Sequence, residues 1–292
     1  MTNSPSTSGH GLFAPLKIAA PPPNLLPSQW ADENRFLSQE SSAEPGRWRT
    51  DRAEYQRGIL DALADPAVEQ LVIMSSAQVG KTEIINNVVG YHMHQDACPI
   101  LVVMPTLELA ESWSKDRLAP MLRDSPSLRG LVKDARSRDS SNTLLAKAYP
   151  GGRLTISGAN SPASLASRPV RVVLCDEVDR FPDSAGTEGD PVSLAKKRTA
   201  SYWNRRIVLT STPTTKGLSR IEAAYLDSDQ RRYHVPCPHC DHFQPLRWAG
   251  IKWTEGDPSS AAYYCEECGS QIDEGEKQKM LMAGRWIAEA PF

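Results

Sequence analysis

The sequence has no apolar run of about 18 residues, the length that a membrane-spanning helix needs, and its start lacks the basic and then apolar layout of a secretory signal. It also lacks an excess of positive charge, because 33 lysine and arginine residues stand against 35 aspartate and glutamate residues, a net charge of -2. A nucleic-acid partner would therefore have to be bound by local basic patches. We expect a soluble intracellular protein with no membrane partner, and 292 residues suffice for one large domain or two smaller ones.

Cysteine is sparse, and the six cysteines do not suggest a disulfide scaffold. Cys98 and Cys175 stand alone beside apolar segments, which is typical of buried thiols. The other four form two Cys-x-x-Cys pairs separated by 24 residues: Cys237, Cys240, Cys265 and Cys268. Two such pairs supply four thiolates for one tetrahedral Zn²⁺, whereas a redox site would need only one pair. The pattern predicts a structural zinc site, with His239 and His242 near enough to serve as substitute ligands.

The chain divides by composition into three parts. Residues 1–46 are rich in proline and serine, which predicts a flexible tail or docking arm. Five short apolar runs then alternate with longer amphipathic stretches, and these runs lie at 70–75, 99–105, 153–157, 170–177 and 206–213. Runs of consecutive aliphatic residues are typical of strands buried on both faces. We predict an α/β domain over 47–229, with a mainly parallel sheet flanked by helices that include 82–93 and 107–122, and a small zinc-ribbon module over 230–292.

Residues 75–82, "SSAQVGKT", approach the phosphate-binding pattern G-x-x-x-x-G-K-[ST]. Gly80, Lys81 and Thr82 match the pattern, and Ser75 stands in place of its first glycine. An apolar run precedes the loop and an amphipathic helix follows it, so the helix N-terminus would face the phosphates of a nucleotide. The residues expected to contact the nucleotide are Ser75, Gln78, Gly80, Lys81 and Thr82. The alternative is an ordinary helix start with Lys81 and Thr82 in solvent.

A second motif, "VRVVLCDE", ends an apolar run in adjacent acids, Asp176 and Glu177. At the carboxyl edge of an α/β sheet, the first acid can hold Mg²⁺ and the second can orient an attacking water. The run that ends in Thr210 and Ser211 would bring hydroxyl groups to the same edge, where they could sense the γ-phosphate. A solvated charged turn and a polar strand end before Pro213 are the simpler alternatives. Taken together, the motifs predict a P-loop NTPase that binds ATP.

The segments "SAQVGKTE", "VMPTLELAESW", "ASRPVRVVLCDEVDRF" and "LTSTP", followed by the paired cysteines, resemble the ATPase region of phage terminase large subunits of the GpA family over residues 47–292. The resemblance implies an ATP-driven motor that packages double-stranded DNA into a capsid. It would act as a homo-oligomer in the host cytoplasm, with a small terminase subunit and a portal protein. By the same resemblance, Lys81 and Thr82 bind phosphate and Mg²⁺, Asp176 binds Mg²⁺ and Glu177 is catalytic. Gln56 is similar to a glutamine that contacts adenine in related motors.

One departure from the family pattern concerns a catalytic arginine. Many large terminases carry an arginine in the loop beside the position of Gln78, where this chain has Ala77. Arg168, eight residues before Asp176, matches the arginine that commonly precedes the second motif. We therefore expect Arg168 to act on the γ-phosphate. The alternatives are Arg171, Arg180 and Arg205.

A second departure concerns DNA cleavage. Large terminases usually carry a metal-dependent nuclease domain after the ATPase, whereas the 79 residues after Pro213 hold no clustered carboxylates on a strand. We expect that this chain does not cut DNA, and that it is a truncated or split product.

Two other functions stay open on the sequence. "PTLELA" resembles a segment by which superfamily 2 helicases contact nucleic acid, but those enzymes need a second motor lobe of about 150 residues. A non-catalytic adaptor that binds nucleotide without hydrolysis is the other alternative. The adjacent acids at 176 and 177 argue against it, because a binding protein does not need the second acid.

Overall fold

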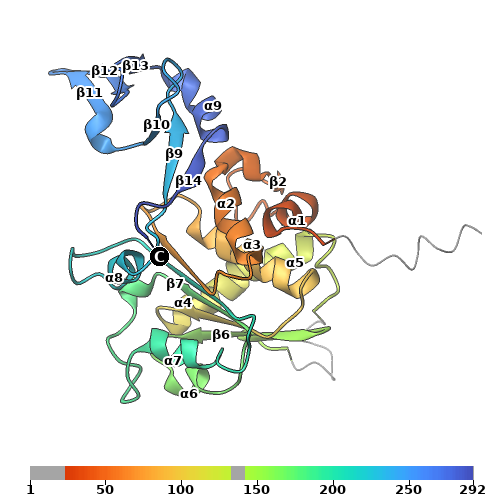
Figure 1. Ribbon diagram of the computed structural model, residues 1–292. Helices are drawn as coiled ribbons and strands as arrows, with labels where there is room; N and C mark the ends of the chain where they lie inside the picture. The colour runs from red at the N-terminus through yellow and green to blue at the C-terminus, as the bar shows by residue number, and fades with distance from the viewer. Residues whose placement is uncertain (1–23, 133–141, 292) are drawn as a thin grey trace, which may run out of the picture.

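The computed structural model describes residues 24–132 and 142–291, and its centre is a six-stranded sheet (Figure 1). In spatial order the strands are β3 (Gln70–Met74), β8 (Arg206–Ser211), β7 (Val172–Asp176), β4 (Ile100–Met104), β6 (Gly152–Gly158) and β5 (Ala146–Tyr149). The first five are parallel, and β5 pairs antiparallel with β6 at one edge. This confirms the predicted α/β fold with a mainly parallel sheet. Each predicted apolar run overlaps one parallel strand, and β5 was not predicted.

Helices cover both faces of this sheet (Figure 1). One face carries α1 (Pro27–Asn34), α2 (Tyr55–Asp61), α3 (Lys81–His94), α4 (Leu107–Trp113) and α5 (Ala119–Asp124), and the other carries α6 (Pro162–Leu165), α7 (Pro191–Lys197) and α8 (Arg220–Leu226). Along β7, Val172 and Leu174 join the first core while Val173 and Cys175 join the second. Burial on both faces explains why the strands read as unbroken apolar runs. The helix predicted over 107–122 is α4 and α5, joined by a π-helical turn.

The strand order brings three carboxyl ends together. Because β8 lies between β3 and β7, the end of each outer strand is aligned with the end of β8. Met74 is in register with Ser211, and Asp176 is in register with Thr210. The predicted phosphate loop, which follows β3, therefore starts beside the acids that end β7.

The segment 24–46 is folded, which differs from the flexible tail expected through residue 46. It forms α1 and two short paired strands, β1 (Phe36–Leu37) and β2 (Gly46–Arg47). Trp30 of α1 is fully buried against α3, where its Nε1 donates to His94 Nδ1 over 3.0 Å. A Cβ on Gly90 would lie 2.3 Å from the Trp30 ring, so the missing side chain makes room for the indole. Residues 1–23 of the expected tail lie outside the described residues.

Replacing Trp30 with phenylalanine tests this packing. The smaller ring leaves a void against Gly90 and removes the hydrogen bond to His94, so the free energy of unfolding should fall by about 1–2 kcal/mol. Chemical denaturation measures this change. The matched control is Trp203→Phe, because Trp203 is 86% exposed. Equal stabilities of the two variants would contradict the buried placement of α1.

The C-terminal part forms two small antiparallel sheets that project beyond α2 (Figure 1). One sheet contains β10 (Phe243–Pro245), β9 (Arg232–Pro236) and β14 (Arg285–Ile287), and the other contains β11 (Ile251–Thr254), β12 (Asp257–Tyr264) and β13 (Gln271–Ile272). The helix α9 (Lys277–Met282) packs against β9, and β14 contacts α2 of the α/β domain directly. Short 3-10 turns complete the chain at Thr50–Ala53, Ala62–Ala64, Val178–Arg180, Trp248–Gly250 and Glu274–Glu276. We call residues 232–287 the C-terminal module.

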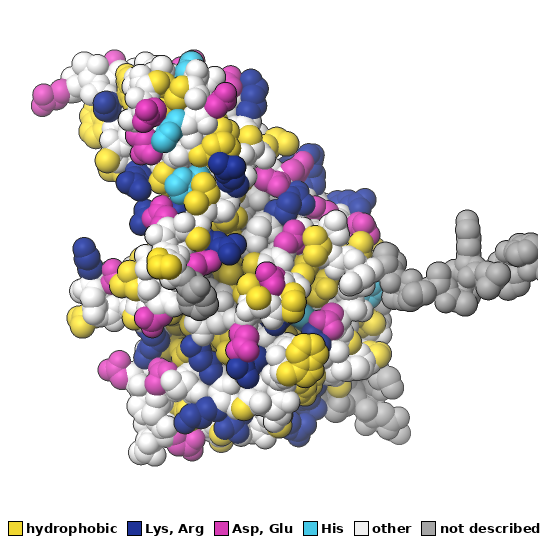
Figure 2. Space-filling view, viewed as in Figure 1, with side chains coloured by type: hydrophobic (Ala, Val, Ile, Leu, Met, Phe, Trp, Pro, Cys, Tyr) yellow, Lys and Arg dark blue, Asp and Glu magenta, His cyan; other side chains and the backbone are white. Residues whose placement is uncertain are grey.

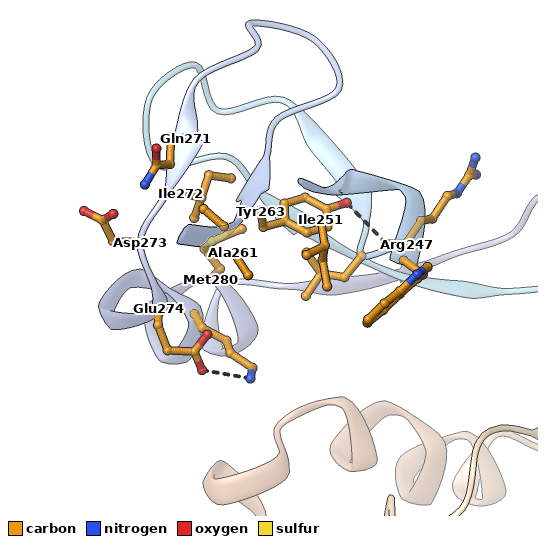
Figure 3. A pocket seen from close by; sticks show the side chains of 13 residues that line it. Arg247, Ile251, Ala261, Tyr263, Gln271, Ile272, Asp273, Glu274 and Met280 are labelled. Atoms are coloured by element: carbon orange, nitrogen blue, oxygen red, sulfur yellow. Dashed lines mark hydrogen bonds and ion pairs between the residues drawn. The ribbon is translucent and has the colours of Figure 1, made fainter. Parts of the chain in front are cut away.

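The C-terminal module has little apolar packing of its own. Its buried hydrophobic cluster is Val235, Cys237, Cys265, Ile272 and Met280. A hollow of about 530 Å³ lies beside this cluster, between the second sheet and α9 (Figure 3). Tyr263 borders the hollow, and its hydroxyl accepts a hydrogen bond from Arg247 N over 3.2 Å. Two of the five buried side chains are cysteines, so packing alone contributes modestly to the stability of this module.

The outer surface carries charges of both signs. Figure 2 shows lysine and arginine side chains interspersed with aspartate and glutamate on the viewed face, in line with the net charge of -2. Among the described residues, no helix has the length and apolar character that crossing a membrane requires.

Candidate active site and candidate metal centre

The loop between β3 and α3 is shaped by two residues with left-handed backbone. Gln78 has a φ of 64° and Gly80 a φ of 84°. The φ of Gly80 favours glycine, and a Cβ there would lie 2.5 Å from Gln56 Nε2, so a larger residue would also have to displace the Gln56 amide. Ser75 is not among the described residues with positive φ. The first position of the motif therefore adopts a backbone conformation that serine tolerates, which explains why the departure at Ser75 leaves the loop intact.

Lys81, the first residue of α3, turns its ammonium group back over the loop. Its Nζ donates to Ser76 O over 2.9 Å and to Thr212 Oγ1 over 2.8 Å, and it lies 3.6 Å from Glu177 Oε1. The side chain is only 6% exposed. A buried ammonium at a helix N-terminus creates a positive site that favours an anion.

Asp176, at the end of β7, gathers two hydroxyl groups. Thr82 Oγ1 donates to its Oδ2 over 3.3 Å, and Thr210 Oγ1 donates to its Oδ1 over 2.5 Å. Burial raises the pKa of Asp176, while the hydrogen bond from Thr210 acts in the opposite direction. Carboxylate and hydroxyl oxygens are the ligands that Mg²⁺ prefers. The oxygen atoms of Thr82 and Asp176 therefore fit the magnesium site that the sequence predicts.

Glu177 follows in a strained conformation. Its φ of 54° is unusual for a residue with a side chain, and such strain is often concentrated at functional sites. Its Oε2 lies 3.4 Å from Thr212 N and 3.5 Å from Ser211 Oγ, both at the end of β8. The carboxylate is thus fixed beside Lys81 at the carboxyl edge of the sheet.

The burial of Asp176 predicts a pH-dependent loss of folding stability. Because its pKa is raised in the folded protein, Asp176 keeps its proton to a higher pH there than in the unfolded chain. The buried carboxylate therefore destabilises the fold fully above the folded pKa, and this loss of stability is relieved as the pH falls through that pKa. Asp176→Asn should therefore raise Tm at neutral pH without ligands, by an amount that shrinks on acidification. Mg²⁺ with ATP should no longer raise the Tm of this variant. A lower Tm for Asp176→Asn in calorimetry would contradict this account.

Gln56 is buried against the loop, although a lone glutamine on an amphipathic helix is commonly a surface residue. Its exposed fraction is 3%, and its Nε2 donates to Val79 O over 3.2 Å. Its Oε1 is buried with no hydrogen-bond partner in the described structure. Tyr55, the residue before Gln56, donates from its hydroxyl to the same Val79 carbonyl over 3.0 Å.

The candidate arginines differ in their distance from this cluster. Arg168 is exposed and precedes β7 by four residues, whereas Asp176 ends that strand. In the described structure, no hydrogen bond or ion pair joins Arg168 to Lys81, Asp176 or Glu177.

The alternative arginines are placed as follows. Arg171 pairs with Asp96, and Arg205 Nη2 lies 2.6 Å from Glu69 Oε2, just before β3. Arg180 is nearest the acids, with its Nε 3.9 Å from Glu177 Oε2, and is 68% exposed. Arg180 is therefore the candidate that this chain itself brings to the cluster.

Asp179 is a residue of this edge that sequence reasoning did not single out. Its Oδ2 accepts from Thr214 N over 2.9 Å, and its Oδ1 accepts from Ile221 N over 2.8 Å at the start of α8. It therefore fastens the segment after β8 to the segment after β7. Its place in the charged run "DEVDR" indicated only a solvated turn.

The four paired cysteines meet in the C-terminal module. Cys237 Sγ lies 3.9 Å from Cys268 Sγ, Cys240 Sγ lies 3.8 Å from Cys265 Sγ, and all four sulfur atoms lie within 4.8 Å of one another. Tetrahedral zinc with bonds of about 2.3 Å places its sulfur ligands about 3.8 Å apart, so the cluster fits this ion. His239 and His242 have other partners, since His239 Nε2 lies 3.0 Å from Gln271 O and His242 Nε2 lies 3.3 Å from Glu266 Oε1.

This chain is similar to the large terminase subunits of two phages. The large terminase subunit of Enterobacteria phage P21 is 32% identical over 283 residues, which cover 94% of this chain and 43% of that protein. The large terminase subunit of Escherichia phage lambda is 33% identical over 276 residues, which cover 91% of this chain and 43% of that protein. The chain therefore spans less than half the length of these two relatives.

A solved structure shares the fold of this chain, and a family model matches its sequence. The crystal structure of the HK97 bacteriophage large terminase superposes with a TM-score of 0.56 at 13% identity, covering 69% of this chain and 40% of that chain. At this identity the likeness shows the fold alone. The family model described as phage terminase large subunit gpA, ATPase domain, matches residues 42–286. Because that match covers most of the chain, the chain belongs to the phage terminase large subunit gpA family, in its ATPase domain.

Proposed function

We propose that this chain binds ATP with Mg²⁺ at the carboxyl edge of β3, β7 and β8 and hydrolyses it. The observation that carries the proposal is the meeting of two motifs distant in sequence. Thr82 of the loop is hydrogen-bonded to Asp176, and Lys81 lies 3.6 Å from Glu177. A plain helix start would not require either contact. Together they support a P-loop NTPase.

Each side chain has a role that its position supports. Lys81 and the loop N–H groups would hold the phosphates, and Thr82 with Asp176 would hold Mg²⁺, which neutralises developing negative charge. Glu177 would accept a proton from the attacking water, and the contacts with Ser211 and Thr212 keep its carboxylate oriented. Thr210 orients Asp176, so β8 supports both acids.

We further propose that hydrolysis drives packaging of double-stranded DNA into a capsid. The two similar terminase large subunits support this role. The expected partners are DNA, a small terminase subunit, a portal protein and further copies of this chain, in the cytoplasm of the host cell. Arg180 of this chain or Arg168 of a neighbouring copy would then act on the γ-phosphate, in place of the arginine that the loop lacks.

Zinc is proposed as the resident ion of the cysteine cluster. Cys237, Cys240, Cys265 and Cys268 would fill its coordination shell, which leaves no open position for catalysis and makes the role structural. The ion would link the two small sheets, since each Cys-x-x-Cys pair belongs to a different one.

The proposed function is tested by steady-state phosphate release with and without long double-stranded DNA. We expect turnover that DNA stimulates and that Lys81→Ala abolishes, because this variant loses the charge that neutralises the phosphates. Stimulated hydrolysis accompanied by separation of the DNA strands would favour a helicase. Nucleotide binding with no turnover, at high protein concentration and with DNA present, would favour the adaptor and contradict the motor.

A further inference from the structure

The C-terminal module is attached to α2 by two aromatic side chains. Trp286 of β14 donates from its Nε1 to Tyr55 O over 2.9 Å, at the first residue of α2. Tyr233 of β9 packs between Tyr55 and Trp286, with its ring centroid 6.2 Å from that of Tyr55 and 5.4 Å from that of Trp286. A Cβ on Gly58 would lie 2.6 Å from Trp286 Cδ1, so α2 has a glycine where the indole rests on it.

The same end of α2 holds the predicted phosphate loop. The Tyr55 hydroxyl and Gln56 Nε2 both donate to the carbonyl of Val79, over 3.0 Å and 3.2 Å. Val79 directly precedes Gly80, whose left-handed backbone starts α3. A carbonyl held by two donors cannot rotate freely, so the direction of the adjoining loop amides depends on the position of Tyr55 and Gln56.

A continuous groove joins the two regions. Its volume is about 1280 Å³, and its walls include Ser75, Val79 and Lys81 of the loop region and Tyr233 and Trp286 of the module. The module therefore borders the same cavity as the loop, on the side of α2. A shift of the module would move both a wall of this cavity and the helix that orients the loop.

We propose that Trp286 is a positioning residue for the phosphate loop, acting through Tyr55. By holding α2, the module keeps the Val79 carbonyl and the following amides in the arrangement that receives phosphates. This inference rests on the proposed ATP site and adds a role for the cysteine-bearing module in nucleotide affinity. Because the module touches α2 and not the paired acids, loosening it should weaken nucleotide binding without slowing the chemical step.

Conservative variants test whether Trp286 acts on the phosphate loop through Tyr55. Trp286→Phe keeps a ring against Tyr233 but loses the donor to Tyr55 O, and Tyr55→Phe loses the donor to Val79 O. Each should raise KM for ATP about three- to tenfold with kcat within about twofold of wild type, the range expected for one hydrogen bond. The double variant should raise KM no more than the larger single change, because Trp286 is proposed to act on the loop through Tyr55. Trp253→Phe, in β11 of the same module and 54% exposed, is the control and should leave KM unchanged.

A second measurement does not require catalysis. Hydrogen exchange at the amides of residues 77–82 should quicken in nucleotide-free Trp286→Phe and stay as in wild type in Trp253→Phe. Gly58→Ala should have the same effect with Trp286 in place, because its methyl group displaces the indole. If the wild-type chain does not hydrolyse ATP, the proposed function fails. Hydrogen exchange at the loop amides still tests whether Trp286 positions the loop. Folded Trp286→Phe and Gly58→Ala proteins with wild-type exchange in the loop would overturn the inference.

Discussion

Glu177→Gln should lower kcat for ATP hydrolysis by about 10²–10⁴-fold, the usual contribution of a general base. Glutamine has nearly the same shape and can keep the contacts with Ser211 Oγ and Thr212 N. It cannot accept a proton from water, so the chemical step is lost. ATP binding should persist, since Lys81, Thr82 and Asp176 are unchanged.

Single-turnover hydrolysis with excess enzyme measures this loss without interference from product release. Glu188→Gln is the matched control, because Glu188 is exposed and belongs to the loop before α7. That variant should hydrolyse ATP at the wild-type rate. If Glu177→Gln also kept the wild-type rate, the water-activating group would have to be another residue.

Removal of zinc should unfold the C-terminal module. Structural zinc contributes roughly 10–16 kcal/mol of apparent binding free energy in small zinc domains at neutral pH. The module has few other sources of stability, because Cys237 and Cys265 are themselves part of its five-residue apolar cluster. We expect one zinc ion per chain by mass spectrometry of metals, and loss of that ion in Cys240→Ser.

The unfolding should be local. Hydrogen exchange in Cys240→Ser should quicken across β9 to β14, while β4 and β7 stay protected because their core does not involve the module. The control is His242→Ala, which should retain one zinc ion because its imidazole faces Glu266. A metal-free chain whose module exchanges as slowly as the zinc-bound chain would show that the cysteines cluster for another reason.

The central sheet could be predicted because its signal is local. Among the parallel strands, β4, β7 and β8 are buried along their whole length and carry aliphatic runs, and the helices between the strands carry apolar residues at helical spacing. β5 was missed because it is an edge strand with three half-buried residues and carries a mixed sequence, "AKAY". α1 was missed because a Pro/Ser-rich composition hides one buried tryptophan, whose partners Gly90 and His94 lie some sixty residues away.

In the candidate site, too, the residues in local motifs could be predicted, and the contacts between distant residues could not. Lys81, Thr82, Asp176 and Glu177 follow from short motifs at strand ends, and parallel strands bring such ends to one edge. The role of Tyr55 could not be predicted, because it depends on a contact with Val79 across the fold. Neither could the contact between Trp286 and α2, which joins residues 231 positions apart.

We infer that the loop after β3 and the acid that ends β7 bind one nucleotide together. The most direct test is calorimetric titration of the chain with ATP, with Mg²⁺ and then with a chelator in its place. We predict one site per chain, affinity that weakens at least about tenfold without Mg²⁺, and loss of binding in Lys81→Ala. Absence of binding by the folded wild-type chain, or equal affinity in Lys81→Ala, would contradict the account.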